Sequence, residues 1–387
     1  MKKRLSIFCF VFVLTMLLCT PAFAKTVCKI GSKGYSSMLE AVNAVKDGQT
    51  ITVTKAIKTS EPFSTFDAKA KKFTIDWKNK KYTYTGTEHA AFHISEGHTV
   101  TVKNLNVQSD YTLFSIANNA SLTIKSGKVT TYQLLHSYGK VNISGGSFYT
   151  PSAERAPFIE NRETGVLSIT KGSFSGEKWL VMNLGKMTIK NGEFKKTSKT
   201  GDQSLIRSHG VSVIKGGAYE SVAGAVITTS NDTAANFTIS GGKFSAPNVV
   251  IENNSQMTIS AGTFKSANYT SGPCVKGRDR SNTKIKGGTF IGGFNVTGKL
   301  TISGGKTNAE VIVGDKGDCT ITKLTIKQDP SPGRGPGNGA MLVNQGGKFT
   351  VKGGKYVSKN GYGFSGKVDF EVSGDYKKLF TVKKMNP

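Results

Sequence analysis

The chain repeats one short pattern of hydrophobic and polar positions between residues 122 and 356. The unit is an apolar residue, a polar residue and Ile or Val, followed by a glycine-containing turn and an aromatic residue. It reads "LTIKSGKV" at 122–129, "FTISGGKF" at 237–244 and "FTVKGGKY" at 349–356. From Gly127 to Gly305 the second turn glycine recurs every 17–26 residues. Such a short unit at a nearly constant spacing is typical of a stacked repeat protein.

Alternation within the unit predicts which side chains face inward. In an extended strand the first and third residues of the triplet share one side, and the middle residue lies on the other. We therefore expect the isoleucines to form one buried column and the aromatic residues after the glycines to form a second. The predicted Ile column is Ile124, Ile143, Ile169, Ile189, Ile214, Ile239, Ile259, Ile285 and Ile302. The predicted aromatic column is Phe148, Phe174, Phe194, Tyr219, Phe244, Phe264 and Phe290.

A second short strand precedes each unit and ends in Asn, Gly or Ser, which favour turns. Examples are "FIENR" at 158–162 and "VVIENN" at 249–254. Between Gly305 and Gly354 the spacing widens to 49 residues, and we interpret "LTIK" at 324–327 as a rung that has lost its glycines. No rung buries enough apolar surface to be stable alone, so the pattern predicts rungs stacked about 4.8 Å apart.

The start of the repeat region has a helical pattern. Ser37 and Glu40 are spaced as a capping box, the apolar residues from Met38 to Val45 follow at helical spacing, and Gly48 ends the segment. The fold prediction is all-β: a single-stranded right-handed parallel β-helix (solenoid) of about 12–14 rungs with a short N-terminal capping helix. Its predicted parts are a signal peptide (1–24), an N-terminal cap (25–50), the β-helix (51–376) and a C-terminal tail (377–387).

The segment "AVNAVKDGQTITV" followed by rungs such as "TISGGKF" resembles the pectin-lyase-like right-handed parallel β-helix superfamily. Within it the chain is most similar to the non-catalytic secreted, adhesin-like β-helix repeat proteins of Gram-positive bacteria. The resemblance covers residues 35–376 and implies the fold. It says little about activity, because the superfamily holds lyases, glycosidases, phage spikes and adhesins.

The N-terminus has the pattern of a signal peptide. Lys2, Lys3 and Arg4 precede an apolar run at 5–19, and Ala22-Phe23-Ala24 places small residues at the cleavage site. No second long apolar segment follows, so we expect no transmembrane segment. The predicted location is secreted or extracellular, with cell-surface association left open.

The net charge is +27, and the 52 basic residues comprise 45 lysines and only 7 arginines. Lysine is a hydrated point charge, whereas specific reading of bases and phosphates favours arginine. The expected partner is therefore an anionic polysaccharide or cell-wall polymer held by diffuse attraction rather than a nucleic acid. The plainer alternative is that the lysines keep a long β-structure soluble. The oligomeric state is left open.

Catalytic motifs are missing from the sequence. Neither the clustered aspartates and Gly-His-Gly of polygalacturonases nor the convergent carboxylates of calcium-dependent lyases are present. We therefore favour a non-enzymatic surface protein, with no catalytic residues and no cofactor. The alternative is a polysaccharide lyase or glycoside hydrolase acting on acidic polysaccharide.

The best candidates for a defined ligand site are cations in two turns. The run "KGRDR" contains Lys276, Arg278 and Arg280, and Arg207 is expected in the corresponding turn about three rungs earlier. We predict these four residues as a ligand-binding ridge for uronates or sulfates. The alternative is that they are solvated turn residues.

The remaining chemistry is sparse. "EHAAFHISEGH" holds His89, His93 and His98, and His136 is expected two rungs from His93. Their spacing matches no closed zinc site, so no metal is predicted. Cys28, Cys274 and Cys319 lack paired spacing; their number allows one disulfide, and we expect small buried residues. The Pro- and Gly-rich stretch at 328–338 is expected to be a loop of unknown role.

Overall fold

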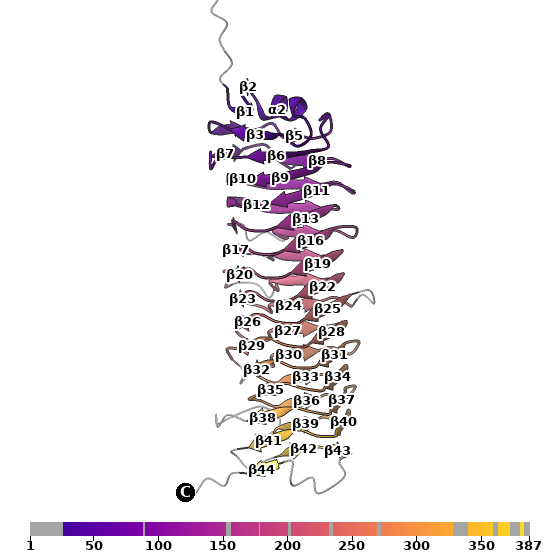
Figure 1. Ribbon diagram of the computed structural model, residues 1–387. Helices are drawn as coiled ribbons and strands as arrows, with labels where there is room; N and C mark the ends of the chain where they lie inside the picture. Colours follow the sequence, from indigo (N-terminus) through magenta and orange to yellow (C-terminus); the bar gives the residue numbers. More distant parts are fainter. Residues whose placement is uncertain are drawn as a thin grey trace, which may run out of the picture.

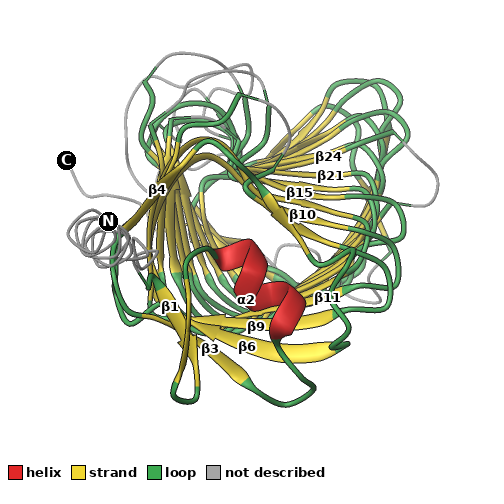
Figure 2. Cartoon of the chain, turned by 90° about the horizontal axis from the view of Figure 1, so that it is seen from above, coloured by secondary structure: helices red, strands yellow, loops and turns green. Residues whose placement is uncertain are grey.

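The computed structural model is a right-handed parallel β-solenoid of about twelve turns with one short helix (Figure 1). The fold class predicted from the repeat is confirmed. The structure describes residues 26–87, 90–151, 156–177, 179–199, 203–231, 235–268, 272–327, 340–358, 363–371 and 380–382. The predicted signal peptide and the loop at 328–338 lie outside these residues. Seen from above, three faces of stacked strands enclose the core (Figure 2).

Sheet 1 contains the apolar–polar–Ile triplets. Its strands pair in parallel from β3 onward, whereas β1 pairs antiparallel with both β2 and β3. The strands are β1 (Cys28–Ile30), β2 (Lys33–Tyr35), β3 (Thr50–Val53), β6 (Lys72–Asp76), β9 (Thr99–Lys103), β11 (Ser121–Ile124), β13 (Lys140–Ile143), β16 (Val166–Ile169), β19 (Lys186–Ile189), β22 (Val211–Ile214), β25 (Asn236–Ile239), β28 (Gln256–Ile259), β31 (Asn282–Ile285), β34 (Lys299–Ile302), β37 (Asp318–Ile321), β40 (Lys348–Val351) and β43 (Asp369–Phe370).

Sheet 2 follows the turn after sheet 1, which contains glycine in most rungs, and carries the aromatic column. Its strands are β4 (Ile57–Thr59), β7 (Tyr82–Tyr84), β14 (Ser147–Thr150), β17 (Ser173–Gly176), β20 (Glu193–Lys196), β23 (Ala218–Ser221), β26 (Lys243–Ala246), β29 (Thr263–Ser266), β32 (Thr289–Ile291), β35 (Lys306–Thr307), β38 (Thr325–Lys327), β41 (Lys355–Ser358) and β44 (Phe380–Val382). The last of these, in the segment assigned to a tail, pairs in parallel with β41.

Sheet 3 completes each rung with strands of two or three residues. They are β5 (Phe63–Ser64), β8 (Phe92–Ile94), β15 (Ile159–Asn161), β18 (Val181–Asn183), β21 (Ile206–Ser208), β24 (Ile227–Thr229), β27 (Ile251–Asn253), β30 (Val275–Gly277), β33 (Phe294–Val296), β36 (Val311–Val313), β39 (Leu342–Asn344) and β42 (Phe364–Ser365). Two long strands, β10 (Leu105–Ile116) and β12 (Gly127–Ser137), run from sheet 2 into sheet 3 without a break.

Both predicted columns lie in the core. Every isoleucine from Ile124 to Ile302 in the predicted column is fully buried, and adjacent members are paired in register. The aromatic residues from Phe148 to Phe290 are also buried. Their rings stack with centroids 4.7–5.0 Å apart and planes within 5–16° of parallel. This spacing equals the strand spacing of a sheet, so the stacking follows directly from the register.

The rung that has lost its turn glycines is present, but "LTIK" at 324–327 is not its sheet 1 triplet. The triplet of that rung is in β37, where Ile321 pairs with Ile302 and Val351. "LTIK" instead reaches sheet 2, where Ile326 occupies the aromatic position and pairs with Tyr356. An apolar–polar–apolar run fits either sheet, because both bury alternate residues.

A ladder of short polar side chains lines the corner between sheets 3 and 1. Asn161, Asn183, Ser208, Thr229 and Asn253 are all buried there. The Asn161 amide donates to Asn183 Oδ1 at 2.7 Å, and Thr229 Oγ1 donates to Asn253 Oδ1 at 2.7 Å. The turn residues predicted from sequence are thus internal hydrogen-bonding groups as well as turn formers.

Helix α2 (Met38–Ala44) covers the N-terminal end of the core, as predicted (Figure 2). Ser37 Oγ accepts from the Glu40 amide at 3.1 Å, and Met38, Ala41 and Val42 are buried. Glu40 Oε2 accepts from the Ser36 amide and hydroxyl rather than from Ser37, so the capping box is displaced by one residue. The three cysteines after the predicted signal peptide are buried and free.

Candidate functional site

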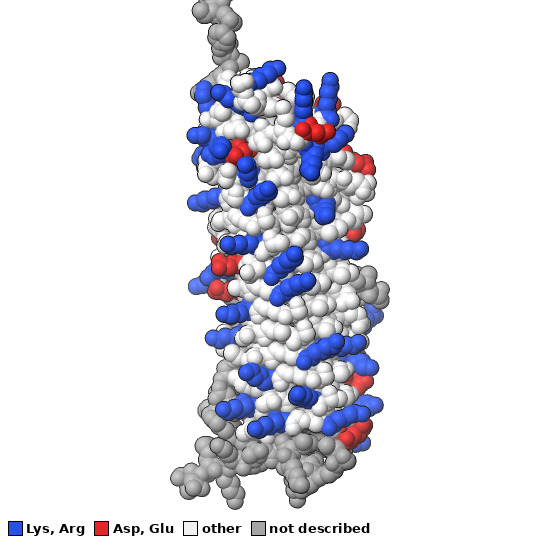
Figure 3. Space-filling model, in the orientation of Figure 1, with Lys and Arg blue, Asp and Glu red and all other residues white. Residues whose placement is uncertain are grey.

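The outer surface of sheet 1 and the glycine turn beside it form a basic face. From β11 to β34, each of nine strands presents three outward positions: its first residue, its third residue and the residue after its inward Ile. These twenty-seven positions contain no acidic residue and eight lysines. The lysines are Lys125, Lys140, Lys186, Lys190, Lys215, Lys284, Lys286 and Lys299, and all are exposed. Figure 3 shows basic side chains along the length of this face.

The position after the inward Ile is the most regular part of the basic face. From Lys103 to Lys352, each of which follows an inward Val in the same register, this position holds only lysine, serine or threonine. The serines and threonines, such as Ser144 and Ser240, donate their hydroxyls to the carbonyl of the inward Ile one rung earlier, at 3.3–3.4 Å. A rung therefore has either a hydroxyl bound back to the main chain or an ammonium extended into solvent.

Most lysines of this column have no acidic partner. Lys103 pairs with Asp76 at 3.3 Å, and Lys352 pairs with Glu371 at 2.7 Å. Within the part of the chain that the structure describes, the other four lie beyond 4.0 Å from any carboxylate oxygen. They are Lys125, Lys190, Lys215 and Lys286. Their charge is thus available to an anion from solution.

The glycine turn itself is hollowed where Lys125 and Lys171 border it. A cavity of about 520 Å³ crosses four rungs there, and its lining includes Gly145, Gly146 and Gly172. A β-carbon on Gly145 would lie 2.8 Å from the Lys125 carbonyl oxygen, so the close approach of these two rungs requires glycine there. Glu193 also lines this cavity.

Two of the four predicted ridge residues lie in strands, and the other two lie in the turn after β30. Arg207 and Lys276 are the central, outward residues of β21 and β30 rather than turn residues. They lie three rungs apart in one column, with Thr228 and Glu252 between them. Arg278 lies in the turn after β30. Arg207 packs instead over the Trp179 ring, with its guanidinium carbon 5.4 Å from the ring centre.

Arg278 and Arg280 do share a cavity of about 620 Å³ beside Glu252 and Asp279. Arg278 donates to Glu252 Oε1 through two nitrogens, which neutralises much of its charge. Lys316 Nζ lies 3.2 Å from Asp279 Oδ2. Hydrogen bonding from Thr297 and Lys316 holds the pKa of Asp279 below its usual value. This cavity therefore combines both charges, whereas the twenty-seven outward positions from β11 to β34 carry only positive charge.

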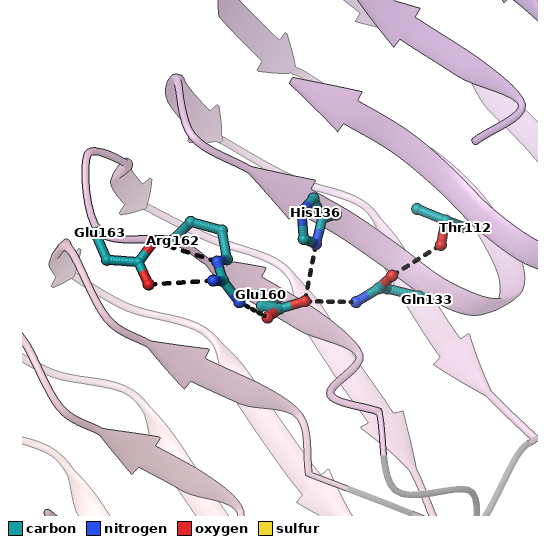
Figure 4. A network of polar contacts seen from close by, with 6 residues as sticks. All are labelled: Thr112, Gln133, His136, Glu160, Arg162 and Glu163. Carbon is teal, nitrogen blue, oxygen red and sulfur yellow. Dashed lines mark hydrogen bonds and ion pairs between the residues drawn. The ribbon is translucent and has the colours of Figure 1, made fainter. Parts of the chain in front are cut away.

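Besides the basic face and the cavity at Arg278, a cluster of hydrogen-bonded polar residues lies on sheet 3 near the N-terminal end (Figure 4). His136 Nδ1 and Glu160 Oε2 are 2.8 Å apart, and Arg162 donates to Glu160 Oε1 at 2.8 Å. Gln133 also donates to Glu160, at 3.3 Å. The His136 hydrogen bond, and then Arg162, lower the pKa of Glu160 to about 2. Glu160 is therefore ionised and fully engaged at neutral pH.

His93 and His136 lie two rungs apart with Ser115 between them, which confirms the predicted spacing. His93 Nδ1 lies 3.3 Å from Ser115 Oγ. Among the described residues no group of three or more His, Cys, Asp and Glu could hold a metal ion. His89 lies outside the described residues. Sequence reasoning missed Gln133 and Glu160, although Glu160 falls in the strand "FIENR" that the repeat did predict.

The comparisons with known proteins leave the family undetermined. No family model matches the chain, and no curated protein or solved structure matches it either. Across the described ranges, no helix is long and apolar enough to cross a membrane.

Proposed function

We propose that the protein is a secreted, non-enzymatic, adhesin-like surface protein that holds an anionic polysaccharide or cell-wall polymer on its basic face. The observation that carries this proposal is the run of twenty-seven outward positions with eight lysines and no acid. Lysines in register on stacked rungs repeat at multiples of about 4.8 Å. A straight row of charges suits an extended polymer better than a small anion.

The proposal is tested with the four lysines of the column after the inward Ile that have no acidic partner among the described residues, here called the corner lysines because they lie where sheet 1 turns into sheet 2. Lys125, Lys190, Lys215 and Lys286 are replaced together by serine, the residue that the same column holds in other rungs. This change keeps the local main-chain hydrogen bonding and removes four charges. Binding to polygalacturonate and to purified teichoic acid is measured by biolayer interferometry at low and physiological salt. We expect a loss of about tenfold or more, because each lost cation removes one counterion-releasing contact.

A matched control removes the same charge elsewhere. Lys46, Lys55, Lys58 and Lys80 are exposed and lie near the N-terminal end. Replacing these four by serine should weaken binding far less than the corner variant. Equal losses would mean that net charge alone attracts the polymer. No binding by the unaltered protein at low salt would refute the proposed function.

The second candidate function is a polysaccharide lyase or glycoside hydrolase acting on acidic polysaccharide. The cavity that joins Arg278 and Arg280 with Glu252 and Asp279 favours it, since cations and carboxylates meet there. An enzyme would release unsaturated products that absorb in the ultraviolet, or new reducing ends. If prolonged incubation with polygalacturonate yields neither product, the enzymatic alternative is refuted and only the binding function is left.

A further inference from the structure

A cavity near the N-terminal end of sheet 3 differs chemically from the basic face. It has a volume of about 620 Å³ and lies beside β8, β10 and β12. Its walls include Phe63, Tyr111, Gln133 and His136. None of the described residues that line it is Lys, Arg, Asp or Glu. In a chain with 52 basic residues, such a lining points to an uncharged ligand.

The solenoid departs from its repeat at this cavity. Strands β10 and β12 have 12 and 11 residues, whereas most other strands have two to four. The pairing of β10 with β12 shifts register between Ser109 and Thr112. This bulge lies at Tyr111, whose side chain is 37% exposed on the cavity wall. Bulges that re-aim side chains are common beside binding sites.

Polar groups in the cavity are held in fixed orientations. Gln133 is 7% exposed; its Oε1 accepts from Thr112 Oγ1 at 2.8 Å, and its Nε2 donates to Glu160 at 3.3 Å (Figure 4). One hydrogen of that amide nitrogen remains for a ligand oxygen. Because ionised Glu160 only accepts, His136 Nδ1 is the donor in their bond. Both side chains are thus oriented before any ligand arrives.

We propose that this cavity binds one or two rings of a neutral sugar. A pyranose has an apolar face of C–H groups, which Tyr111 can cover, and hydroxyls at its edge, which Gln133 and His136 can bond. The volume lies within the range of small-molecule sites. The site goes beyond the proposed polyanion function, since it uses other residues on another sheet.

The test measures binding of neutral trisaccharides by isothermal titration calorimetry. The probes are cellotriose, maltotriose, mannotriose and triacetylchitotriose, with trigalacturonate as the charged comparison. We expect at least one neutral trisaccharide to bind and to be preferred over trigalacturonate. Tyr111→Ala and Gln133→Ala should each weaken that binding about tenfold or more, which is a 1.4 kcal/mol change at the quoted constant.

Tyr149→Ala is the matched control, because Tyr149 is 38% exposed and does not line the cavity. It should leave the sugar affinity unchanged, and thermal unfolding should show that all three variants are folded. Failure of every neutral probe to bind, preference for trigalacturonate, or unaltered affinity of folded Tyr111→Ala would each overturn the proposal. Sugar binding that persists in the four-lysine corner variant separates this site from the basic face.

Discussion

Gly146 and Phe148 fit so closely that a β-carbon on Gly146 would lie 2.6 Å from Phe148 Cζ. Gly146 also has φ of +118°, a region that L side chains rarely adopt. The same relation recurs at Gly192, where a β-carbon would lie 3.0 Å from Phe194 Cε2. The glycine and the aromatic residue two positions later are therefore one structural unit. The glycine turns the chain and also leaves room for the ring.

Gly146→Ala should accordingly cost about 2–4 kcal/mol of stability, from strained backbone and displaced ring together. Gly48→Ala is the control, because Gly48 has φ of +78° and a β-carbon there would meet no atom within 4 Å. It should cost only about 1–2 kcal/mol. Urea unfolding followed by circular dichroism compares the two. Equal shifts in midpoint would show that the aromatic contact is irrelevant.

The sequence predicted the inward columns because one register rule governs both sheets. Ile143 and Phe148 could be assigned to the core since strand alternation fixes them relative to Gly146. The rung at 318–327 was recognised, but its two strands could not be assigned to their sheets. "DCTI" and "LTIK" have the same alternation, and the glycines that distinguish the sheets are missing there.

The candidate sites were harder to predict than the core. Arg207 was expected in a turn, but its place in β21 depends on where the short strand begins, which alternation alone does not fix. Gln133 and Glu160 meet only because β12 continues into sheet 3 and pairs there with β15. The outward positions of the nine rungs could be compared only when the register of their strands was known. Only then was it clear that these positions contain no acidic residue.

Asn183 should be important for stability although it is not at a site. It is fully buried; its amide donates to Val211 O at 3.1 Å and to Ser212 Oγ at 3.0 Å, and its Oδ1 accepts from Asn161. Asn183→Ala should cost about 2–4 kcal/mol, since buried partners lose their hydrogen bonds. Asn118→Ala, at an exposed turn, should cost well under about 1 kcal/mol. Similar unfolding midpoints for both variants would contradict the ladder's role.

Glu160 should make stability depend on pH in the acid range. Its pKa is lowered to about 2 in the folded protein from an ordinary 4.5, so the folded state favours the ionised form. The stabilisation is present above about pH 4.5 and is lost as pH falls toward 2, by up to about 3 kcal/mol. Glu160→Gln should remove most of this slope in unfolding measured between those pH values. An unchanged slope would assign the acid sensitivity to other carboxyls.

The four predicted ridge residues provide the sharpest contrast with the basic face. Replacing Arg207, Lys276, Arg278 and Arg280 together by glutamine removes as many charges as the corner variant. We expect the loss of polygalacturonate affinity to match that of the N-terminal control. The reason is that Arg278 is already bonded to Glu252, and Arg207 lies three rungs from Lys276. Charges dispersed in this way act through the general field, where each contributes little.

The salt dependence of the polygalacturonate affinity distinguishes diffuse attraction from binding at a defined site. Diffuse attraction by many lysines requires affinity to fall steeply between low and physiological salt, because released counterions then contribute less. If the ridge variant abolishes binding while the corner variant retains it, the ligand occupies a defined site at Arg278 and Arg280. If the affinity of the unaltered protein barely changes with salt, electrostatic attraction is not the driving force. The basic face would then serve solubility, because a surface that binds a polyanion through eight lysines cannot be insensitive to screening.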